Sequence, residues 1–380
     1  RDAAETYPAD QERYVGIVAA TPLLKWQTQF YMFCQIANDA RPIRRGRRKG
    51  MDRFRMPTTV AQRNHNWILA LKSMGNVPIT SIASGLFYDC KHLALTNLPS
   101  STTERVGAYA FAYCESLALR VLPPVQVVGR AAFSNCTQLP LAAFPDTLWH
   151  IVEWGFEFCP NIHATALPTG LRFLEGETFR GCASLALTVL PALTEEVGVN
   201  RGTFDGCWTL ALTGLPNHFT YIGQFAFRNC TTMHFPALPD TVTVIGKLAF
   251  KGCNSLMLVR MPVALERLGF ESFRGCTRMQ LLQGFHQPQA PQPLPAVKWG
   301  AFADCHLLQI PSASLGPAMS PMAFLNTNGY MQQLFVDRDL QADPPDRTQP
   351  EHQRRKWLLE KYNNVRECVP ERVEGYYDPV

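Results

Sequence analysis

The sequence predicts a solenoid, a rod in which one short structural unit is repeated and stacked along an axis. Three regularities predict this fold class. Ten of the twelve cysteines recur at intervals of 22 to 29 residues, a phenylalanine stands three residues before each of the ten, and pairs of leucines follow most of them. A fixed period in the twenties indicates one supersecondary unit per coil, and such a unit can bury its apolar face only against its neighbours.

The cysteines and phenylalanines are expected to stack in two inner columns. The gaps from Cys90 to Cys305 are 24, 22, 23, 23, 25, 23, 23, 23 and 29 residues. A degenerate last unit follows, with Phe324 in register and Thr327 in the cysteine position. The residues expected to form the repeat core are Phe111, Cys114, Phe133, Cys136, Phe179, Cys182, Phe204, Cys207, Phe227, Cys230, Phe250, Cys253, Phe273 and Cys276.

Each unit also carries strand and turn signals. Leucines at three and five residues after the cysteine, such as Leu117 and Leu119, alternate with period two and predict a short strand with one buried face. A Leu-Pro pair such as Leu122-Pro123 ends that strand, because proline cannot donate to a strand ladder. An apolar-Gly pair such as Val128-Gly129 follows, where glycine allows a close approach of two backbones.

These units resemble the BspA-type leucine-rich repeat. The stretch AFRNCTTMHFPALPDTVTVIGKLAFKGC, residues 226–253, looks like this family, whose units have the pattern Cys-x-x-Leu, Leu-Pro, Ile-Gly, Ala-Phe-x-x-Cys. The resemblance covers residues 78–330, or about eleven coils. It implies a leucine-rich-repeat solenoid, an α/β-type repeat protein with short parallel strands on its concave face. It also implies a surface or interaction protein without a catalytic constellation.

The cysteines are expected to be structural. Zinc sites use paired ligands such as C-x-x-C, and this spacing is absent from the chain. A ladder of disulfides is an alternative. However, the Cβ atoms of stacked coils point in parallel and lie about 4.8 Å apart, which is a longer Cβ–Cβ distance than a relaxed disulfide prefers. We therefore interpret each as a small buried hydrophobic residue with a weak S–H donor, and we expect no metal. The sequons at Asn135 and Asn229 are interpreted as turn asparagines rather than glycan sites.

Composition and motifs exclude several function classes. A hydrophobic content of 46% with 18% charged residues excludes a disordered chain, and no apolar stretch is long enough for a membrane-spanning helix. The chain lacks a G-x-G-x-x-G segment opening a helix, a P-loop, H-E-x-x-H and G-x-S-x-G. We therefore expect neither enzymatic activity nor a cofactor.

The N-terminal extension, residues 1–77, is basic. It carries 13 Lys and Arg against 6 Asp and Glu, whereas residues 78–330 carry 15 of each. We expect helices beginning near Thr21 and spanning about 59–74, the second capping the first coil. Between them, residues 41–55 form an arm that is expected to bind RNA or another polyanion, with an acidic protein surface or a passive tail as alternatives. Its basic residues are Arg41, Arg44, Arg45, Arg47, Arg48, Lys49, Arg53 and Arg55.

The C-terminal extension, residues 331–380, is expected to contain a linker, an amphipathic helix and an extended tail. The residues expected to bind a partner through that helix are Arg354, Arg355, Lys356, Trp357 and Tyr362. On the solenoid, residues between the buried leucines, such as Ala118 and Thr188, form a small and mildly polar face. This face suits either docking of a protein segment or contact with solvent.

Three functional hypotheses follow from the extensions. The first is a non-catalytic scaffold within a large intracellular assembly, as an accessory subunit of an organellar (mitochondrial) ribosome whose arm lies on RNA. The second is an accessory subunit of a protein-only organellar membrane complex. The third is a secreted or surface recognition protein. Because the chain opens at Arg1 rather than at Met, we expect it to be processed or truncated.

Overall fold

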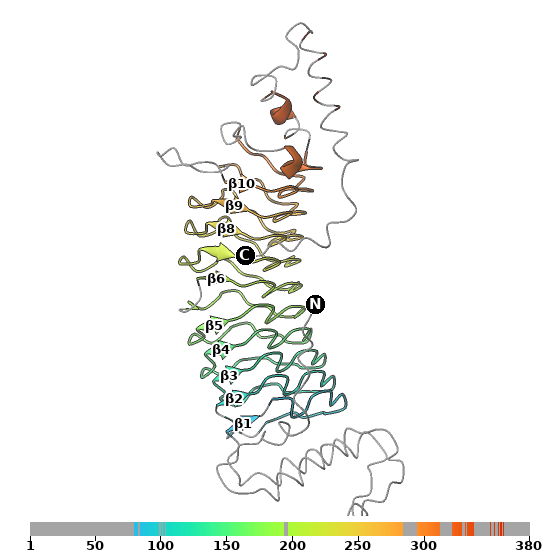
Figure 1. The fold of residues 1–380 in the computed structure, drawn as a ribbon, viewed down its shortest axis with the longest axis vertical. Helices are drawn as coiled ribbons and strands as arrows, with labels where there is room; N and C mark the ends of the chain where they lie inside the picture. The colour runs from blue at the N-terminus through green and yellow to red at the C-terminus, as the bar shows by residue number, and fades with distance from the viewer. Residues whose placement is uncertain are drawn as a thin grey trace, which may run out of the picture.

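The computed structural model shows a rod of stacked coils (Figure 1). It describes residues 80–82, 84–98, 100, 102, 104–193, 197–283, 295–311, 321–328, 331 and 333–337, with 350, 353, 356, 358 and 360 as single positions. Along one side of the rod, successive coils contribute two-residue strands. These are β1 (Ser81–Ile82), β2 (Arg105–Val106), β3 (Val127–Val128), β4 (His150–Ile151), β5 (Phe173–Leu174), β6 (Gly198–Val199), β7 (Tyr221–Ile222), β8 (Val244–Ile245), β9 (Arg267–Leu268) and β10 (Ala296–Val297).

The strands form two parallel five-stranded sheets. β1 to β5 pair in chain order, and β6 to β10 do the same. The register is constant, so that Val106, Val128 and Ile151 lie opposite one another with buried side chains. No pairing joins β5 to β6 in the described part of the chain, and this interruption coincides with the 25-residue gap between Cys182 and Cys207.

The position of the strands corrects one expectation. The two-residue strands lie at an apolar residue that glycine follows in five of the described coils, as in Val128-Gly129, and not at the alternating leucines. The leucine segments do bury alternate side chains, but one or two backbone hydrogen bonds join them per coil, as from Ala118 N to Leu95 O, and in the described residues they form only the isolated bridge between Val121 and Ala143. At the strands, two links form, as from Val127 N to Glu104 O and from Gly129 N to Val106 O. Where glycine follows the strand it permits a close approach, because a Cβ on Gly129 would lie 2.8 Å from the backbone nitrogen of Ala108. Strands β4 and β5 pair in the same register with Val152 and Glu175 in that position.

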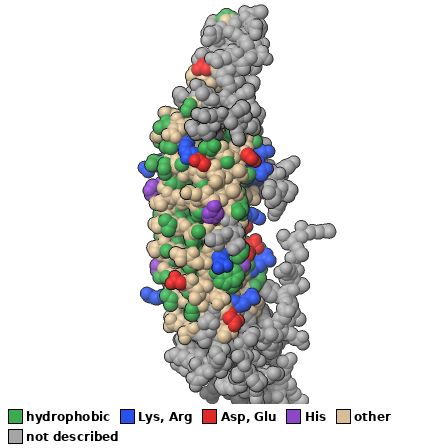
Figure 2. Space-filling model, turned by 90° about the vertical axis from the view of Figure 1, so that its left-hand side faces the viewer, with side chains coloured by type: hydrophobic (Ala, Val, Ile, Leu, Met, Phe, Trp, Pro, Cys, Tyr) green, Lys and Arg blue, Asp and Glu red, His purple; other side chains and the backbone are tan. Residues whose placement is uncertain are grey.

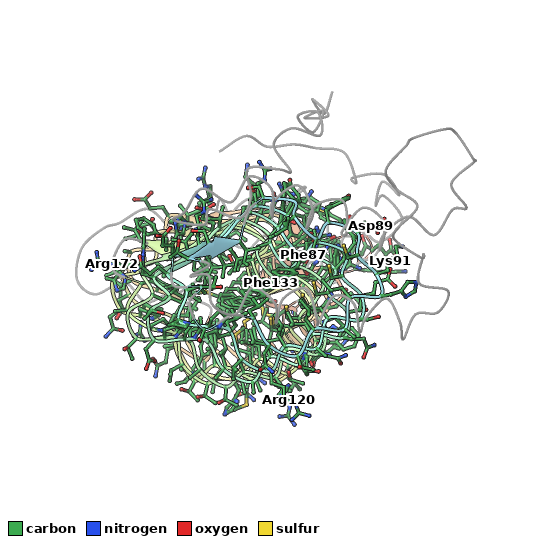
Figure 3. The ribbon with its side chains drawn as sticks, turned by 90° about the horizontal axis from the view of Figure 1, so that it is seen from below. Phe87, Asp89, Lys91, Arg120, Phe133 and Arg172 are labelled. Atoms are coloured by element: carbon green, nitrogen blue, oxygen red, sulfur yellow. The ribbon has the colours of Figure 1, made fainter. Side chains whose placement is uncertain are left out.

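The phenylalanines fill the centre of the rod. Viewed from its end, the coils superimpose, with Phe87 and Phe133 inside and Asp89, Lys91, Arg120 and Arg172 pointing outward (Figure 3). Neighbouring rings from Phe87 through Phe302 to Phe324 are nearly parallel, with centroids 5.0 to 5.9 Å apart. The stacked column therefore extends into the degenerate last coil.

Each coil makes a tight turn around its phenylalanine. The residues five and one before the cysteine have positive φ, as at Tyr109 (56°) and Tyr113 (63°). Their N–H groups and that of Phe111 donate to carbonyls of the next coil, at 2.8, 2.8 and 2.7 Å. The position before the cysteine holds Asn135 (60°) and Asn229 (62°), which agrees with their interpretation as turn residues because asparagine tolerates this conformation.

The C-terminal end of the solenoid is covered. The 3₁₀ helix η3 (Pro321–Phe324) brings Phe324 onto Phe302, and Phe335 packs against Phe324 with ring centroids 5.1 Å apart. Met331 and residues 333–337 are helical, and Met331, Phe335 and Val336 are buried. The expected N-terminal helices lie outside the described residues.

Candidate functional site

The cysteine column has a specific geometry. Each thiol from Cys114 to Cys305 donates to the carbonyl oxygen of the phenylalanine in the preceding coil, with Sγ–O distances of 3.0 to 3.2 Å. Cysteine thus supplies both a small apolar side chain and a donor for a buried carbonyl. All the core phenylalanines and cysteines named from the sequence are buried in these two columns.

The same burial lowers the reactivity of the thiols. Loss of solvation raises the pKa of the thiols of Cys159, Cys182, Cys207 and Cys230 well above the ordinary value. All ten described cysteines are free, and no group of three or more metal-ligating side chains occurs among the described residues. These thiols are therefore buried packing and hydrogen-bonding groups of the described coils.

The residues predicted to bind partners lie largely outside the described part of the chain. This holds for the whole arm, residues 41–55, and for Arg354, Arg355, Trp357 and Tyr362. Lys356 is described as helical and exposed, and Leu358, two residues later, is buried. Binding by these residues stays a prediction.

The structure brings together a set of side chains that sequence reasoning did not single out. We call it the strand-side patch and define it as Trp149, His150, Phe173, Val197 and Tyr221. The ring centroids of Trp149 and Phe173 are 6.0 Å apart, and the His150 ring lies 5.1 Å from Phe173. Trp149 and Val197 are 36% and 56% exposed. Figure 2 faces this side of the rod and shows hydrophobic and charged side chains spread over it.

The patch spans the interruption between the two sheets. A Cβ on Gly198 would lie 2.6 Å from a ring carbon of Tyr221, so the Tyr221 ring lies over this glycine on the side that leads back to β5. The Tyr221 hydroxyl donates to Oδ1 of Asn200 at 2.5 Å, and Nδ2 of Asn200 donates to the carbonyl of Leu174 at 3.0 Å. The Asn200 side chain thus links the two halves where the strand ladder stops.

Polar groups hold and surround the patch. Nε2 of His150 lies 2.6 Å from Oε1 of Glu175, whose other oxygen accepts from the backbone N–H of Glu153 at 3.1 Å. Exposed arginines lie on the same side of the rod, at Arg105, Arg172 and Arg267. Aromatic side chains with arginines around them are typical of the residues that dominate protein–protein binding.

A second band of charge runs along the turns that precede the cysteines. Its carboxylates are largely buried, whereas the cations that pair with them are more exposed, as for Asp205 with Arg228 at 2.6 Å and Glu271 with Lys251 at 3.0 Å. Several cations also lie over aromatic rings, such as Arg130 over Trp154 at 4.5 Å and Arg228 over Phe225 at 4.7 Å. This band is internally paired and links successive coils.

Comparison with solved structures finds other repeat proteins. A leucine-rich repeat protein from Bacteroides ovatus is 22% identical, with 60% of this chain and 81% of that chain covered and a TM-score of 0.33. A leucine-rich cell surface protein from Faecalibacterium prausnitzii is 21% identical, covering 61% and 76%, with a TM-score of 0.37. A leucine-rich repeat protein from T. pallidum is 26% identical, covering 55% and 74%, with a TM-score of 0.31. No curated protein matches the sequence.

The family comparison covers more than half of the chain. The family described as the BspA type leucine rich repeat region matches residues 104–200 and 197–330, in six copies. Among the described residues, no helix has the length and apolar character needed to cross a membrane. The repeat spacing, the stacked phenylalanine and cysteine columns and this match agree, and the chain belongs to the BspA-type leucine-rich-repeat family.

Proposed function

We propose that this protein is a non-catalytic scaffold that binds another protein through the strand-side patch. The observation that supports the proposal is the cluster of Trp149, His150 and Phe173, with Tyr221 two coils beyond Phe173, which is partly exposed on the strand side of the rod. Exposed apolar clusters with polar rims are typical of interaction sites. Family membership is consistent with this role, since repeat solenoids offer long lateral binding surfaces.

Site-specific cross-linking tests the proposal. A photo-reactive amino acid replaces Trp149 in the full chain, and a control chain carries it in place of Met257, which is similarly exposed but outside the patch. We expect a discrete protein adduct from position 149 and none from position 257. Equal adducts from both positions, or none from position 149, would contradict binding at the patch.

Three hypotheses concern the cellular role of the scaffold: a ribosomal subunit, a subunit of a membrane complex, and a secreted or surface protein. The secreted or surface reading gains support from family membership, because the resemblance implies surface or interaction proteins. Nothing in the family match or in the described residues supports the ribosomal reading, which depends only on the arginine-rich arm, residues 41–55. The reading as a subunit of a membrane complex has no support beyond the same extensions.

Native fractionation separates the three readings. A surface protein is recovered from the cell exterior or the culture medium. A ribosomal subunit co-sediments with ribosomal RNA and leaves it on RNase treatment or in high salt, because arginine–phosphate contacts weaken steeply with salt. A subunit of a membrane complex co-migrates with that complex and is insensitive to RNase. Deleting residues 41–55 removes RNA association if the protein is a ribosomal subunit, and it changes nothing if the protein is a surface protein.

A further inference from the structure

One edge of the rod, which we call the cysteine corner, is formed by the residues just before and just after each cysteine. The preceding position always has positive φ and holds a side chain in most coils, but it holds glycine in two adjacent pairs, Gly181 with Gly206 and Gly252 with Gly275. A Cβ on Gly206 would meet only the backbone of Gly181, at 3.6 Å, and a Cβ on Gly275 only that of Gly252, at 3.8 Å. Each pair therefore leaves two successive coils without side chains at this position.

The two glycine pairs have different surroundings. The first is bordered by two exposed aromatic residues, Phe158 at 41% and Trp208 at 58% exposure. The Phe158 ring lies against Gly181, since a Cβ there would be 2.5 Å from Cδ1 of that ring. The second pair has Asn254 and Thr277 at the positions after its cysteines, so it lacks aromatic neighbours in these columns.

Hydrogen bonds fix the backbone at Trp208, and a cation contacts the ring of Phe158. The carbonyl oxygen of Trp208 accepts hydrogen bonds from the hydroxyls of Thr231 and Thr232 in the next coil, both at 3.1 Å. The guanidinium of Arg180 lies 5.3 Å from the centroid of the Phe158 ring. The Phe158 ring covers Gly181, whereas Gly206 is left as an uncovered floor between that ring and the exposed Trp208.

The spacing of the two coils along the rod suits one type of ligand. Phe158 precedes its cysteine and Trp208 follows its own, in coils two steps apart, so their backbones are separated by about 10 Å along the rod axis. One turn of a polyproline II helix contains three residues and spans about 9 Å, so prolines at i and i+3 lie on the same face at nearly this distance. Aromatic side chains are the usual recognition surface for such segments.

We propose that the cysteine corner around Gly181 and Gly206 binds a proline-rich segment in the polyproline II conformation, and that the segment is residues 286–295 of a second copy of the chain. This sequence, HQPQAPQPLP, has prolines at 288, 291, 293 and 295, and Pro288 and Pro291 have the required i, i+3 spacing. In this arrangement the two prolines pack on Phe158 and Trp208, and the glycine floor lets the segment approach the backbone closely.

The topology favours a second copy over the same chain. Pro295 directly precedes β10, so the C-terminal end of the segment is anchored on the strand side of the rod. The cysteine corner, marked by Asp89 and Lys91, lies away from the strand in the end view (Figure 3). A segment that starts from the strand side of one molecule reaches the corner of a neighbour without wrapping around its own coil.

A matched pair of glycine substitutions tests the site. Gly206→Asn places a side chain on the floor between the aromatic residues, and Gly275→Asn makes the same change at the second pair. Both glycines have a φ of 75°, and asparagine already occupies the equivalent position at Asn135 and Asn229, so both variants are expected to fold. Thermal unfolding of each variant checks that the fold is retained.

The first readout is fluorescence anisotropy with a labelled synthetic peptide of residues 284–295 and the full-length chain. We expect saturable binding that weakens at least about tenfold in Gly206→Asn and in Trp208→Ala, and that is unchanged in Gly275→Asn. A peptide with Pro288 and Pro291 replaced by alanine is expected to bind at least as weakly. No binding up to about 1 mM peptide, or equal binding by Gly206→Asn and Gly275→Asn, would overturn the site.

The second readout is sedimentation of the full-length chain over a range of concentrations. We expect concentration-dependent self-association that is lost in Trp208→Ala and on deletion of residues 286–295, but kept in Gly275→Asn. A chain that binds the peptide yet stays monomeric would overturn the assignment to a second copy and leave the corner to a proline-rich segment of another protein. Neither readout depends on the strand-side patch, so this inference and the proposed function fail independently.

Discussion

Removing one ring from the phenylalanine column tests the packing of the whole rod. Phe227 is fully buried, and its ring stacks on Phe204 at 5.6 Å and on Phe250 at 5.3 Å. Phe227→Ala therefore loses the transfer free energy of a buried ring and two aromatic contacts, and it leaves a cavity that the rigid coils cannot close. We expect the free energy of unfolding to fall by about 3–5 kcal/mol.

Urea denaturation followed by circular dichroism measures this loss, with Phe225→Ala as the matched control. Phe225 lies two residues earlier in the same turn, but it is only half-buried and its ring is covered by the Arg228 guanidinium at 4.7 Å. Its substitution is expected to cost about 1 kcal/mol or less. Amide exchange of the Phe227 N–H, which donates to Ala249 O at 2.8 Å, reports the local effect. If Phe227→Ala cost no more than Phe225→Ala, the stacked column would not be what stabilises the rod.

Three further predictions concern other parts of the repeat. The thiols from Cys114 to Cys305 should resist alkylation in the native protein and react on unfolding, since burial raises their pKa. Peptide-resolved mass spectrometry measures the alkylation of each cysteine, and rapid labelling of the native protein would contradict the prediction. Burial also raises the pKa of Glu157, so the folded state holds this proton more tightly than the unfolded state. The stability of the wild type relative to Glu157→Gln should thus decrease as the pH rises from the ordinary glutamate pKa towards 7, and a flat difference in urea midpoints would contradict this. Gly246→Ala should destabilise the rod by about 1–3 kcal/mol, because the added Cβ would lie 2.6 Å from the backbone nitrogen of Gln224. Gly214→Ala is the control and should have little effect, because its added Cβ has no atom within 4 Å. Equal shifts of the melting temperature in the two variants would refute the close approach of the backbones at Gly246.

Most of the repeat core could be predicted from the sequence, because its signal is local and repeated ten times. The spacing of Phe227 and Cys230 recurs in every coil, and a side chain in such a column contacts mainly its equivalents in the neighbouring coils. The position of the strands was predicted wrongly. The alternation of Leu117 and Leu119 is a valid strand signal, but the ladder forms at a later apolar segment of each coil, with glycine beside it at Gly129 and without glycine at β4 and β5.

The candidate sites could not be predicted in the same way, because they depend on departures from the repeat. Trp149 and Phe173 are far apart in sequence and become neighbours only when their coils stack, and Tyr221 is linked to Leu174 of β5 through Asn200. Aligning the units by their cysteines would have shown His150, Phe173 and Tyr221 at the same repeat position, and it would have shown glycine at Gly198 between them. The direction of the Tyr221 ring over Gly198 and the link through Asn200 need the structure itself.

Binding to the cross-linked partner is the most direct test of the proposed scaffold function. Once that partner is purified, isothermal titration calorimetry compares the wild type, Trp149→Ala and the control Met257→Ala. We expect Trp149→Ala to weaken binding at least about tenfold, which corresponds to about 1.4 kcal/mol, and Met257→Ala to bind as the wild type does. Equal affinities of the wild type and Trp149→Ala would contradict binding through the strand-side patch.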